Sequence, residues 1–211
     1  MDQRTKTTIE QYDKIASDYA QTQKDYNDAG VEVDKFIKLL PVGSMVLDLG
    51  CAGGRDTKIL TLAGMRAIGI DLSKKLLEIA RTENPTIEFR VADIRQIPFP
   101  DNSVDGIMAR GVIHHLDIND IKSALKEFCR VLKQGGILFI MTKSGKGVIK
   151  NIDILSSGKE REFTLLSQDE LSSFLANTGF KKIEIYTWNE RQRGMKGGRD
   201  VNWISAFYSK V

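Results

Sequence analysis

Short apolar segments alternate with helix-length amphipathic segments from about residue 30 to the end of the chain. This alternation is typical of βαβ units, in which a helix connects two neighbouring parallel strands. The 211 residues are enough for one domain of this kind. The sequence therefore predicts an α/β fold in which residues 1–211 form one domain around a doubly wound, Rossmann-like sheet. The first five predicted strands are Met45–Leu49, Arg66–Asp71, 86–91, 104–109 and 137–141.

Two further strands, at about 181–188 and 201–208, bring the predicted number to seven. The loop between them, 189–199, is too short for a crossover helix, so the seventh strand must run antiparallel to the sixth. The sheet is thus expected to be mostly parallel, with an antiparallel last strand. If the sixth strand is parallel to the others, loop 189–199 lies at the carboxyl edge of the sheet, where such folds bind ligands.

Helix boundaries are marked by a few residues. Ser73 is a good N-cap for a helix that follows the second strand, and Ser167–Glu170 has the form of a capping box. A third amphipathic helix is predicted at 118–132. Gly135 and Gly136 are expected to end it before the fifth strand begins.

Two segments stand outside the regular alternation. Residues 1–29 are polar and are expected to form an N-terminal cap that is partly helical. Residues 144–166 are rich in Gly, Ser and Lys around their first half, and no regular element is predicted there. This second segment is interpreted as an insertion that leaves the carboxyl edge of the sheet, near the mouth of a ligand site.

Composition excludes several function classes. The two cysteines, Cys51 and Cys129, lie far apart, and His114 and His115 are the only histidines, so neither a disulfide nor a metal site is expected. The formal charge of +3 is too small to indicate nucleic-acid binding by itself. No apolar run approaches the ~18 residues that span a membrane, and no secretion signal is expected from the polar first residues. A cytoplasmic protein is expected, and its oligomeric state cannot be derived from the sequence.

The sharpest motif is a glycine-rich turn after the first strand, Asp48-Leu-Gly-Cys-Ala-Gly-Gly54. Glycine has no Cβ, so a ligand can approach the backbone of such a turn closely. The second strand ends in another acid, Asp71, which is placed to accept hydrogen bonds from the hydroxyls of a ribose. These two features alone also suit NAD.

Two other acids favour a different ligand. Asp48 occupies a strand-end position that is usually apolar in dinucleotide-binding folds, and its carboxylate could hold a cationic amine. Asp93 follows the third strand and is placed to accept a proton from an adenine amine. The predicted ligand therefore has an ammonium group, a ribose and an adenine, and it needs no pyrophosphate clamp.

With these motifs in order, the chain resembles a class I S-adenosylmethionine-dependent methyltransferase of the small single-domain group related to the ubiquinone and menaquinone enzymes. The resemblance is close over about residues 40–143 and loose elsewhere. It is carried by the glycine-rich turn and by Gly69-Ile-Asp-Leu72, Ala92-Asp-Ile94, Ile97-Pro-Phe-Pro100, Asp105, His114-His-Leu116 and Leu132-Lys-Gln-Gly-Gly-Ile-Leu138.

The resemblance implies S-adenosyl-L-methionine as cofactor and assigns residues to its parts. The methionine portion is expected beside Gly50 and Cys51, and a backbone contact near the sulfur is expected at Arg110. Asp71 is expected to bind the ribose, and Leu72 is expected to pack on the adenine. Asp93 and Ile94 are expected to lie at the edge of the adenine.

Three positions near the turn and in the cap carry further expectations. The family commonly has glycine where this chain has Ala52, so the backbone at Ala52 is expected to avoid positive φ, or Gly53 to take up the strain. Tyr12 and Tyr19 are seven residues apart, share one helical face, and resemble a segment that closes over the cofactor. The alternative is that both tyrosines only pack the cap onto the domain.

His114 and His115 follow the fourth strand and are candidate catalytic residues. Either imidazole could remove a proton from a nucleophilic oxygen or nitrogen near neutral pH. Alternatively, the pair shapes the pocket and precedes the helix that starts near Asp117. Methyl transfer needs no base if the reacting atoms are held in line.

The resulting functional hypothesis is methyl transfer to an O, N or C atom of a small-molecule acceptor. An acceptor that carries an anionic group would agree with this hypothesis. An RNA or protein acceptor is the first alternative, because loop 189–199 carries four basic residues that could recognise a carboxylate, a phosphate or an RNA backbone: Arg191, Arg193, Lys196 and Arg199. A solvated loop without that role remains open. An NAD-dependent oxidoreductase is disfavoured by Asp48 and Asp93, and a cofactor-binding module without catalysis also stays open.

Overall fold

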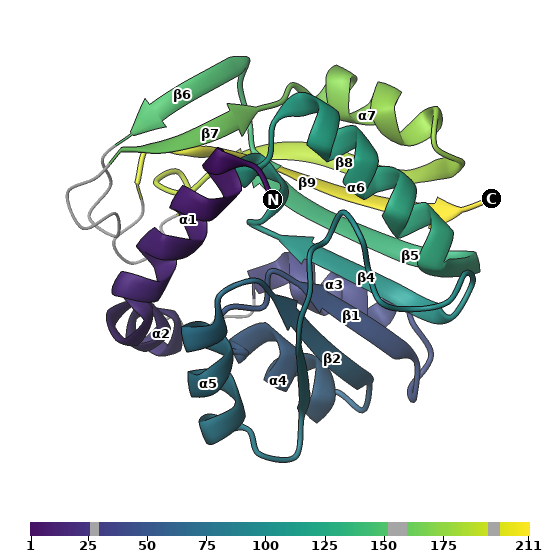
Figure 1. Ribbon diagram of the computed structural model, residues 1–211. Helices are drawn as coiled ribbons and strands as arrows, with labels where there is room; N and C mark the ends of the chain where they lie inside the picture. Colours follow the sequence, from purple (N-terminus) through teal and green to yellow (C-terminus); the bar gives the residue numbers. More distant parts are fainter. Residues whose placement is uncertain (26–29, 152–159, 194–198) are drawn as a thin grey trace.

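A computed structural model describes residues 1–25, 30–151, 160–193 and 199–211 of the chain (Figure 1). Its centre is a seven-stranded sheet with the order β3-β2-β1-β4-β5-β9-β8. The predicted Rossmann-like architecture is confirmed. The strands are β1 (Met45–Leu49), β2 (Arg66–Asp71), β3 (Glu88–Val91), β4 (Val104–Arg110), β5 (Leu132–Lys143), β8 (Phe180–Asn189) and β9 (Asn202–Lys210).

Strand directions agree with the expectation for the end of the chain. β1 to β5 pair in parallel, and β9 pairs antiparallel with both β5 and β8. β8 therefore runs parallel to β1–β5, although β9 lies between it and β5. The connection from β8 to β9 consequently starts at the carboxyl edge of the sheet.

Helices cover both faces of this sheet. α6 (Ile118–Val131) and α7 (Gln168–Ala176) pack their apolar sides on one face, where Leu47 and Ile107 belong to the larger core cluster. α3 (Gly30–Lys38) and α4 (Arg55–Leu62) pack on the other face. Because both faces are covered, consecutive residues of the inner strands are buried, as in the nearly continuous apolar run of β1.

The N-terminal segment adds two helices, α1 (Gln3–Lys14) and α2 (Ala16–Asp25), as expected for a partly helical cap. Figure 1 shows α1 running across the upper part of the carboxyl edge and α2 near α5 (Lys74–Glu83). Ser73 is the N-cap of α5, and Ser167 forms the capping box of α7, as predicted.

The segment 144–166 contains structure that was not predicted. β6 (Gly147–Asn151) and β7 (Arg161–Leu165) form a separate two-stranded antiparallel sheet, and β7 lies against the short 3-10 helix η1 (Ile113–His115). The alternation of polar and apolar residues in β6 and β7 is weak. Packing against η1 and β5, rather than local sequence preference, therefore accounts for this ribbon.

The expected role of Gly135 and Gly136 is wrong. α6 ends at Val131, and both glycines lie inside β5, beside a register shift in its pairing with β4. The helix ends because tertiary contacts take up its last carbonyls. The backbone N–H of Asn102 donates to Arg130 O, and the N–H of Ser103 donates to Val131 O.

Lys210, at the end of β9, contributes to the same junction. Its ammonium group is nearly buried and donates to Asn102 Oδ1 at 2.7 Å, to Cys129 O at 2.6 Å and to Leu132 O at 2.8 Å. The positive charge of Lys210 thereby provides donors for carbonyl groups at the carboxyl end of α6, where a cation interacts favourably with the helix dipole.

Replacing Lys210 by methionine is expected to lower the free energy of unfolding by about 2 kcal/mol, because three acceptors lose a charged donor in a buried place. Urea unfolding followed by circular dichroism measures the change. Lys126→Met, on the exposed side of α6, is the matched control and is expected to have little effect. Equal midpoints for the two variants would contradict this account of the junction.

Candidate functional site

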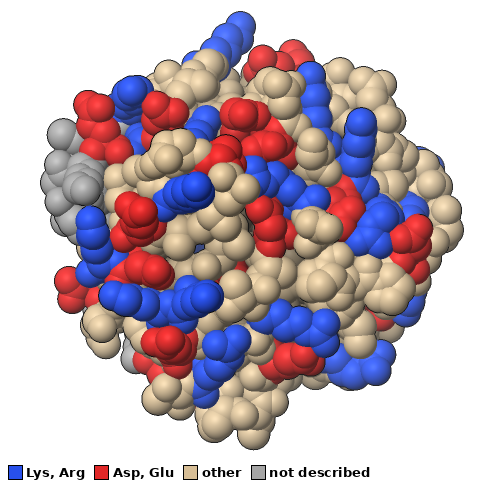
Figure 2. All heavy atoms as spheres, in the orientation of Figure 1, with Lys and Arg blue, Asp and Glu red and all other residues tan. Residues whose placement is uncertain are grey.

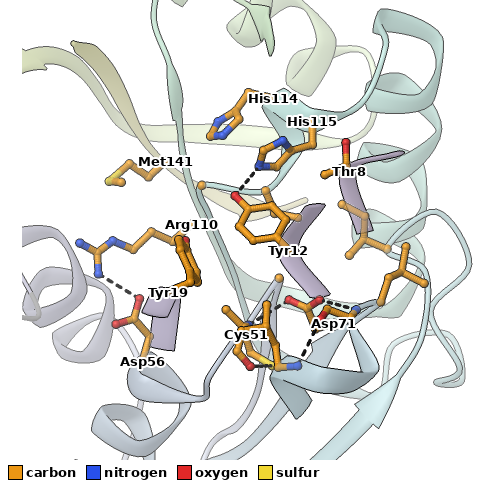
Figure 3. Close-up of a pocket in the computed structure, with 18 of the residues that line it drawn as sticks. Thr8, Tyr12, Tyr19, Cys51, Asp56, Asp71, Arg110, His114, His115 and Met141 are labelled. Carbon is orange, nitrogen blue, oxygen red and sulfur yellow. Dashed lines mark hydrogen bonds and ion pairs between the residues drawn. The ribbon is translucent and has the colours of Figure 1, made fainter. Parts of the chain in front are cut away.

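A cavity of about 710 Å³ lies at the carboxyl edge of the sheet, where β1, β2 and β4 end and α1 and α2 cover the opening (Figure 3). Every residue predicted as a cofactor or catalytic residue lines this cavity. They are Tyr19, Asp48, Gly50, Cys51, Asp71, Leu72, Asp93, Ile94, Arg110, His114 and His115. The structure thus brings the predicted set together, while the role of each residue in binding or catalysis stays a prediction.

The glycine-rich turn is held tightly against the second strand. Gly50 has a φ of +74°, and its N–H donates to Ile70 O at 2.7 Å. A Cβ added to Gly50 would lie 2.7 Å from the Val112 side chain. Both observations explain why glycine is needed where the chain leaves β1.

The expectation for Ala52 is wrong. Ala52 itself has a φ of +47°, and Gly53 is not among the described residues with positive φ. The N–H of Ala52 donates to Asp71 Oδ2 at 2.9 Å. This hydrogen bond to a buried carboxylate fixes the turn and holds alanine in the left-handed region, at a cost of roughly 1 kcal/mol.

Asp71 is therefore both a turn residue and the candidate ribose ligand. Its second oxygen, Oδ1, accepts a hydrogen bond from the N–H of Ser73 at 2.8 Å. Burial raises the pKa of Asp71, and the two backbone donors partly oppose this effect. Each carboxylate oxygen accepts two hydrogen bonds readily, so both oxygens keep capacity for ligand hydroxyls.

Asp48 lies deeper in the cavity and accepts a hydrogen bond from Thr57 Oγ1 at 2.6 Å. Burial and the nearby Asp56 raise the pKa of Asp48 to about 7. Burial would also raise the pKa of Asp56, but the guanidinium groups of Arg110 and Arg55 lower it below the ordinary value. A cation that binds beside Asp48 would favour its ionised form.

Arg110 reaches the same region through its side chain. Its Nη1 donates to Asp56 Oδ2 at 2.9 Å, as Figure 3 shows. The sequence predicted only a backbone contact at Arg110. The side-chain ion pair could be found only from the fold, because Asp56 belongs to α4 and Arg110 to the end of β4.

Asp93 lines the cavity but is also tied to a cationic neighbour. Arg95 Nη2 donates to Asp93 Oδ2 at 2.7 Å, and Arg95 also pairs with Asp2 and Asp120. Burial opposes ionisation, and hydrogen bonds from Arg95 lower the pKa of Asp93. Asp93 is therefore an ionised acceptor, and its interaction with Arg95 links the start of α1 to the strand end.

Tyr12 of the cap contacts both Tyr19 and His115. The rings of Tyr12 and Tyr19 meet edge to face at 5.0 Å between centroids. The hydroxyl of Tyr12 lies 3.2 Å from Nε2 of His115, and Figure 3 shows this contact. Both tyrosines line the cavity, so the cap forms part of its wall.

The histidines are neutral in this environment. Burial, followed by the positive charges of Arg161 and Lys143, lowers the pKa of His115 to about 3. Burial and His115, followed by Lys143 and Arg161, lower the pKa of His114 well below its usual value. A neutral imidazole can accept a proton, but one with so low a pKa is a weak base.

Neither imidazole is expected to titrate near the ordinary histidine pKa, since burial and nearby positive charges lower both folded-state pKa values. Because the chain has only His114 and His115, two-bond ¹H–¹⁵N spectra recorded over a pH series report both rings directly. The lowered pKa values also imply that stability falls as the pH drops below the unfolded value of 6.5. A midpoint near 6.5 for either ring would contradict the described burial.

Sequence reasoning missed a set of cavity residues on the side of the histidines. Lys143, at the end of β5, and Arg161, at the start of β7, both line the cavity, together with Phe163 and Trp203. Arg161 and Phe163 lie in the segment where no strand was predicted. The only sequence signal for Arg161 and Phe163 was that the apolar Phe163 is flanked by polar residues.

In loop 189–199, the described arginines that were candidates for recognising an anionic group are paired within the chain. Arg193 pairs with Glu32 and lies over the Trp188 ring at 4.0 Å, and Arg199 pairs with Glu190 at 3.2 Å. Arg191 pairs with Asp200 at 3.9 Å, and Lys196 lies outside the described residues. The three described arginines are thus engaged by carboxylates of the same chain. On the face drawn in Figure 2, basic and acidic side chains are intermixed.

No helix in the described part of the chain is long and apolar enough to cross a membrane. The described residues also include no group of three or more His, Cys, Asp or Glu side chains that could hold a metal ion.

Comparison with known proteins agrees with this geometry. Residues 47–140, which contain the glycine-rich turn and β4, match the family model of a methyltransferase domain. The fold is also that of a solved S-adenosylmethionine-dependent methyltransferase from Methanosarcina mazei, with a TM-score of 0.75 and 18% identity over 87% of this chain and 99% of that one. The cavity therefore lies in a region that is similar to a methyltransferase domain.

Two curated relatives have different named acceptors. A malonyl-[acyl-carrier protein] O-methyltransferase of Yersinia pestis is 36% identical over 100 residues, which are 47% of this chain and 37% of the relative. A tRNA (carboxymethyluridine(34)-5-O)-methyltransferase of Schizosaccharomyces pombe is 36% identical over 126 residues, which are 59% and 52%. The chain spans about half the length, or less, of these relatives.

Proposed function

We propose that the protein transfers the methyl group of S-adenosylmethionine to an O, N or C atom of a small-molecule acceptor. One observation supports this proposal above the others: Asp48, Asp71 and Asp93 lie at or just after the carboxyl ends of β1, β2 and β3 and line a single cavity. An oxidoreductase that uses NAD has no support from the matched family model or from the two relatives described above, which are named as methyltransferases.

The donor groups of the cavity fit this cofactor. Asp71 offers two carboxylate oxygens to a ribose, and Asp48 offers a buried negative charge to an ammonium group. Leu72 and Ile94 provide apolar surface for the adenine, while Asp93 offers an acceptor to its amine. Asp56 pairs with both Arg110 and Arg55 nearby, so Asp48 is the carboxyl group that we assign to the ammonium group.

When bound, the cofactor would supply an electrophilic methyl group on a sulfonium sulfur. The sulfur would be the leaving group, as a neutral thioether. The protein's part is mainly to orient the acceptor and to exclude water. Tyr12 and Tyr19 close the cavity above the turn. The neutral His114 and His115 are the candidate groups for taking a proton from the acceptor.

A small acceptor is favoured over RNA by the shape of the site. The cap helices and β7 form part of the cavity wall, and the described arginines of loop 189–199 are paired within the chain. The relative named as a tRNA methyltransferase is the reason to test RNA as the alternative acceptor.

Two measurements test the proposal in sequence. Isothermal titration calorimetry is expected to show binding of S-adenosylhomocysteine and none of NAD. Turnover with methyl-labelled cofactor over a metabolite panel and bulk RNA is then expected to label a small molecule. Binding of NAD alone would refute the class of cofactor, labelled RNA would favour the alternative acceptor, and binding without turnover on the whole panel would favour a cofactor-binding module.

A further inference from the structure

Arg95 connects three parts of the fold beside the region of the cavity proposed for the adenine. Its Nη2 donates to Asp93 Oδ2 at 2.7 Å, and its Nη1 donates to Asp2 Oδ2 at 2.8 Å. Nη1 also pairs with Asp120 in the first turn of α6. Because Asp93 follows β3 and Asp2 is the N-cap of α1, one guanidinium group joins a strand end, the cap and α6. We refer to these four residues as the Arg95 cluster.

Asp93 is the member of the Arg95 cluster that lines the cavity, whereas Arg95, Asp2 and Asp120 are outside its lining. The Arg95 side chain is 15% exposed, and the side chains of its three partners are 25 to 42% exposed. Arg95 is thus placed to affect a bound ligand through Asp93.

Three N–H groups of Arg95 hold the carboxylate of Asp93. The backbone N–H donates to Asp93 Oδ1 at 2.9 Å, and Nη2–H donates to Oδ2. The Nε–H is shared between the two oxygens, at 3.0 Å from Oδ1 and 3.1 Å from Oδ2. A carboxylate has about four acceptor positions, so within the described chain these donors leave about one on Asp93. One acceptor position is what an N–H of the adenine amine requires.

The pairs with Asp2 and Asp120 fix the orientation of the Arg95 guanidinium. This group is planar, so when carboxylates of two other elements hold Nη1, the directions of Nε and Nη2 toward Asp93 are also set. Burial would raise the pKa of Asp93, but hydrogen bonds from Arg95 lower it below the ordinary value. Asp93 is therefore an ionised acceptor that is already oriented, and a ligand that binds to it does not have to order it.

From this arrangement we propose that Arg95 is a positioning residue that gives the site its preference for the adenine amine, by holding Asp93 so that one acceptor position serves the ligand. This inference rests on the proposed cofactor and adds a residue outside the cavity that determines how its base is recognised. Asp2 makes the N-terminal cap part of the same arrangement. Removal of the charge of Asp2 is therefore expected to weaken recognition of the amine, although Asp2 does not line the cavity.

The test compares two ligands on the whole protein that differ at the edge of the base. S-inosylhomocysteine has a carbonyl oxygen where S-adenosylhomocysteine has the adenine amine. Calorimetry is expected to show that the unmodified protein binds S-adenosylhomocysteine about tenfold more tightly or better, because a carbonyl oxygen offers no donor to the carboxylate of Asp93. The ratio of the two affinities is the quantity that the variants are expected to change.

Two variants test the roles within the Arg95 cluster. Arg95→Met removes the side-chain donors and is expected to lower the affinity for S-adenosylhomocysteine about tenfold, with little change for S-inosylhomocysteine. Asp2→Asn keeps a good N-cap for α1 but removes the charge that Arg95 contacts, so it is expected to lower the affinity for S-adenosylhomocysteine alone, about threefold. Arg130→Met and Asp101→Asn, which break an arginine–aspartate pair outside the cavity, are the matched controls and are expected to change neither affinity.

Thermal unfolding of each variant shows whether it is folded, and Asp2→Asn decides the test if Arg95→Met does not fold. Three results would overturn the inference. They are equal binding of the two ligands by the unmodified protein, an equal loss of both affinities in the variants, which would give Arg95 a structural role alone, and an unchanged ratio of affinities. Absence of S-adenosylhomocysteine binding by the unmodified protein would instead refute the proposed function, so the two failures are distinguishable.

Discussion

Replacing Asp48 by asparagine is expected to raise the free energy of unfolding at pH 8 by about 2 to 4 kcal/mol. The carboxyl group has a pKa of about 7 in the folded protein and 3.8 as its ordinary value. Below pH 3.8 the group is protonated in both states and costs nothing. Between pH 3.8 and 7 the unfolded state ionises first, so the folded state loses stability as the pH rises. Asparagine keeps an acceptor for Thr57 and removes this loss.

Chemical unfolding at several pH values checks the result, because the gain from Asp48→Asn should shrink as the pH falls toward 4. The matched control is Asp105→Asn. A hydrogen bond from Lys133 lowers the pKa of Asp105 against the opposing effect of burial, so this variant should lose stability at pH 8. A gain from Asp48→Asn that does not depend on pH would show that ionisation of Asp48 is not the cause. Asp48 thus lowers the stability of the folded protein, but it provides a buried carboxyl group that a cationic ligand can use.

Replacing Asp71 by asparagine is expected to reduce the affinity for S-adenosylhomocysteine about 30- to 100-fold. Both carboxylate oxygens hold the turn through Ala52 and Ser73 and are the proposed acceptors for the ribose hydroxyls. An asparagine side chain has one acceptor oxygen, so it cannot serve both turn donors and the ligand. Loss of one or two charge-assisted hydrogen bonds corresponds to about 2 to 3 kcal/mol.

Calorimetry with S-adenosylhomocysteine measures this loss, and thermal unfolding separates it from a defect in folding. Asp101→Asn is the control, since Asp101 is exposed, pairs with Arg130 and does not line the cavity. If Asp71→Asn bound S-adenosylhomocysteine as tightly as the unmodified protein, the assignment of the ribose to the end of β2 would be wrong.

Much of the fold could be predicted because the inner strands are buried on both faces. β1 and β2 have the bounds that the apolar runs of the sequence predicted, and the reversal of β9 followed from the length of the loop before it. The end of α6 could not be predicted in this way. Its last carbonyls are satisfied by residues 102, 103 and 210, which local sequence does not connect to the helix.

The residues of the candidate site also differ in whether their proximity could be predicted from the sequence. Asp48, Asp71 and Asp93 could be placed together from sequence, because parallel strands direct their carboxyl ends to one edge of the sheet. Lys143 and Arg161 could not, since their proximity depends on β7 folding back over η1. The paired state of Arg191 and Arg193 likewise depends on acids that are distant in sequence or belong to another element.

The sequence by itself determined which residues end the strands and which cofactor class they suit, since strand order along the chain and the glycine-rich turn are local properties. Only the tertiary structure decided the protonation preferences in the cavity, the left-handed backbone of Ala52 and which cationic side chains line the cavity. The physical reason is that burial and electrostatic interaction depend on what surrounds a group in space, and most of the groups around His114 and His115 come from segments far away in the chain.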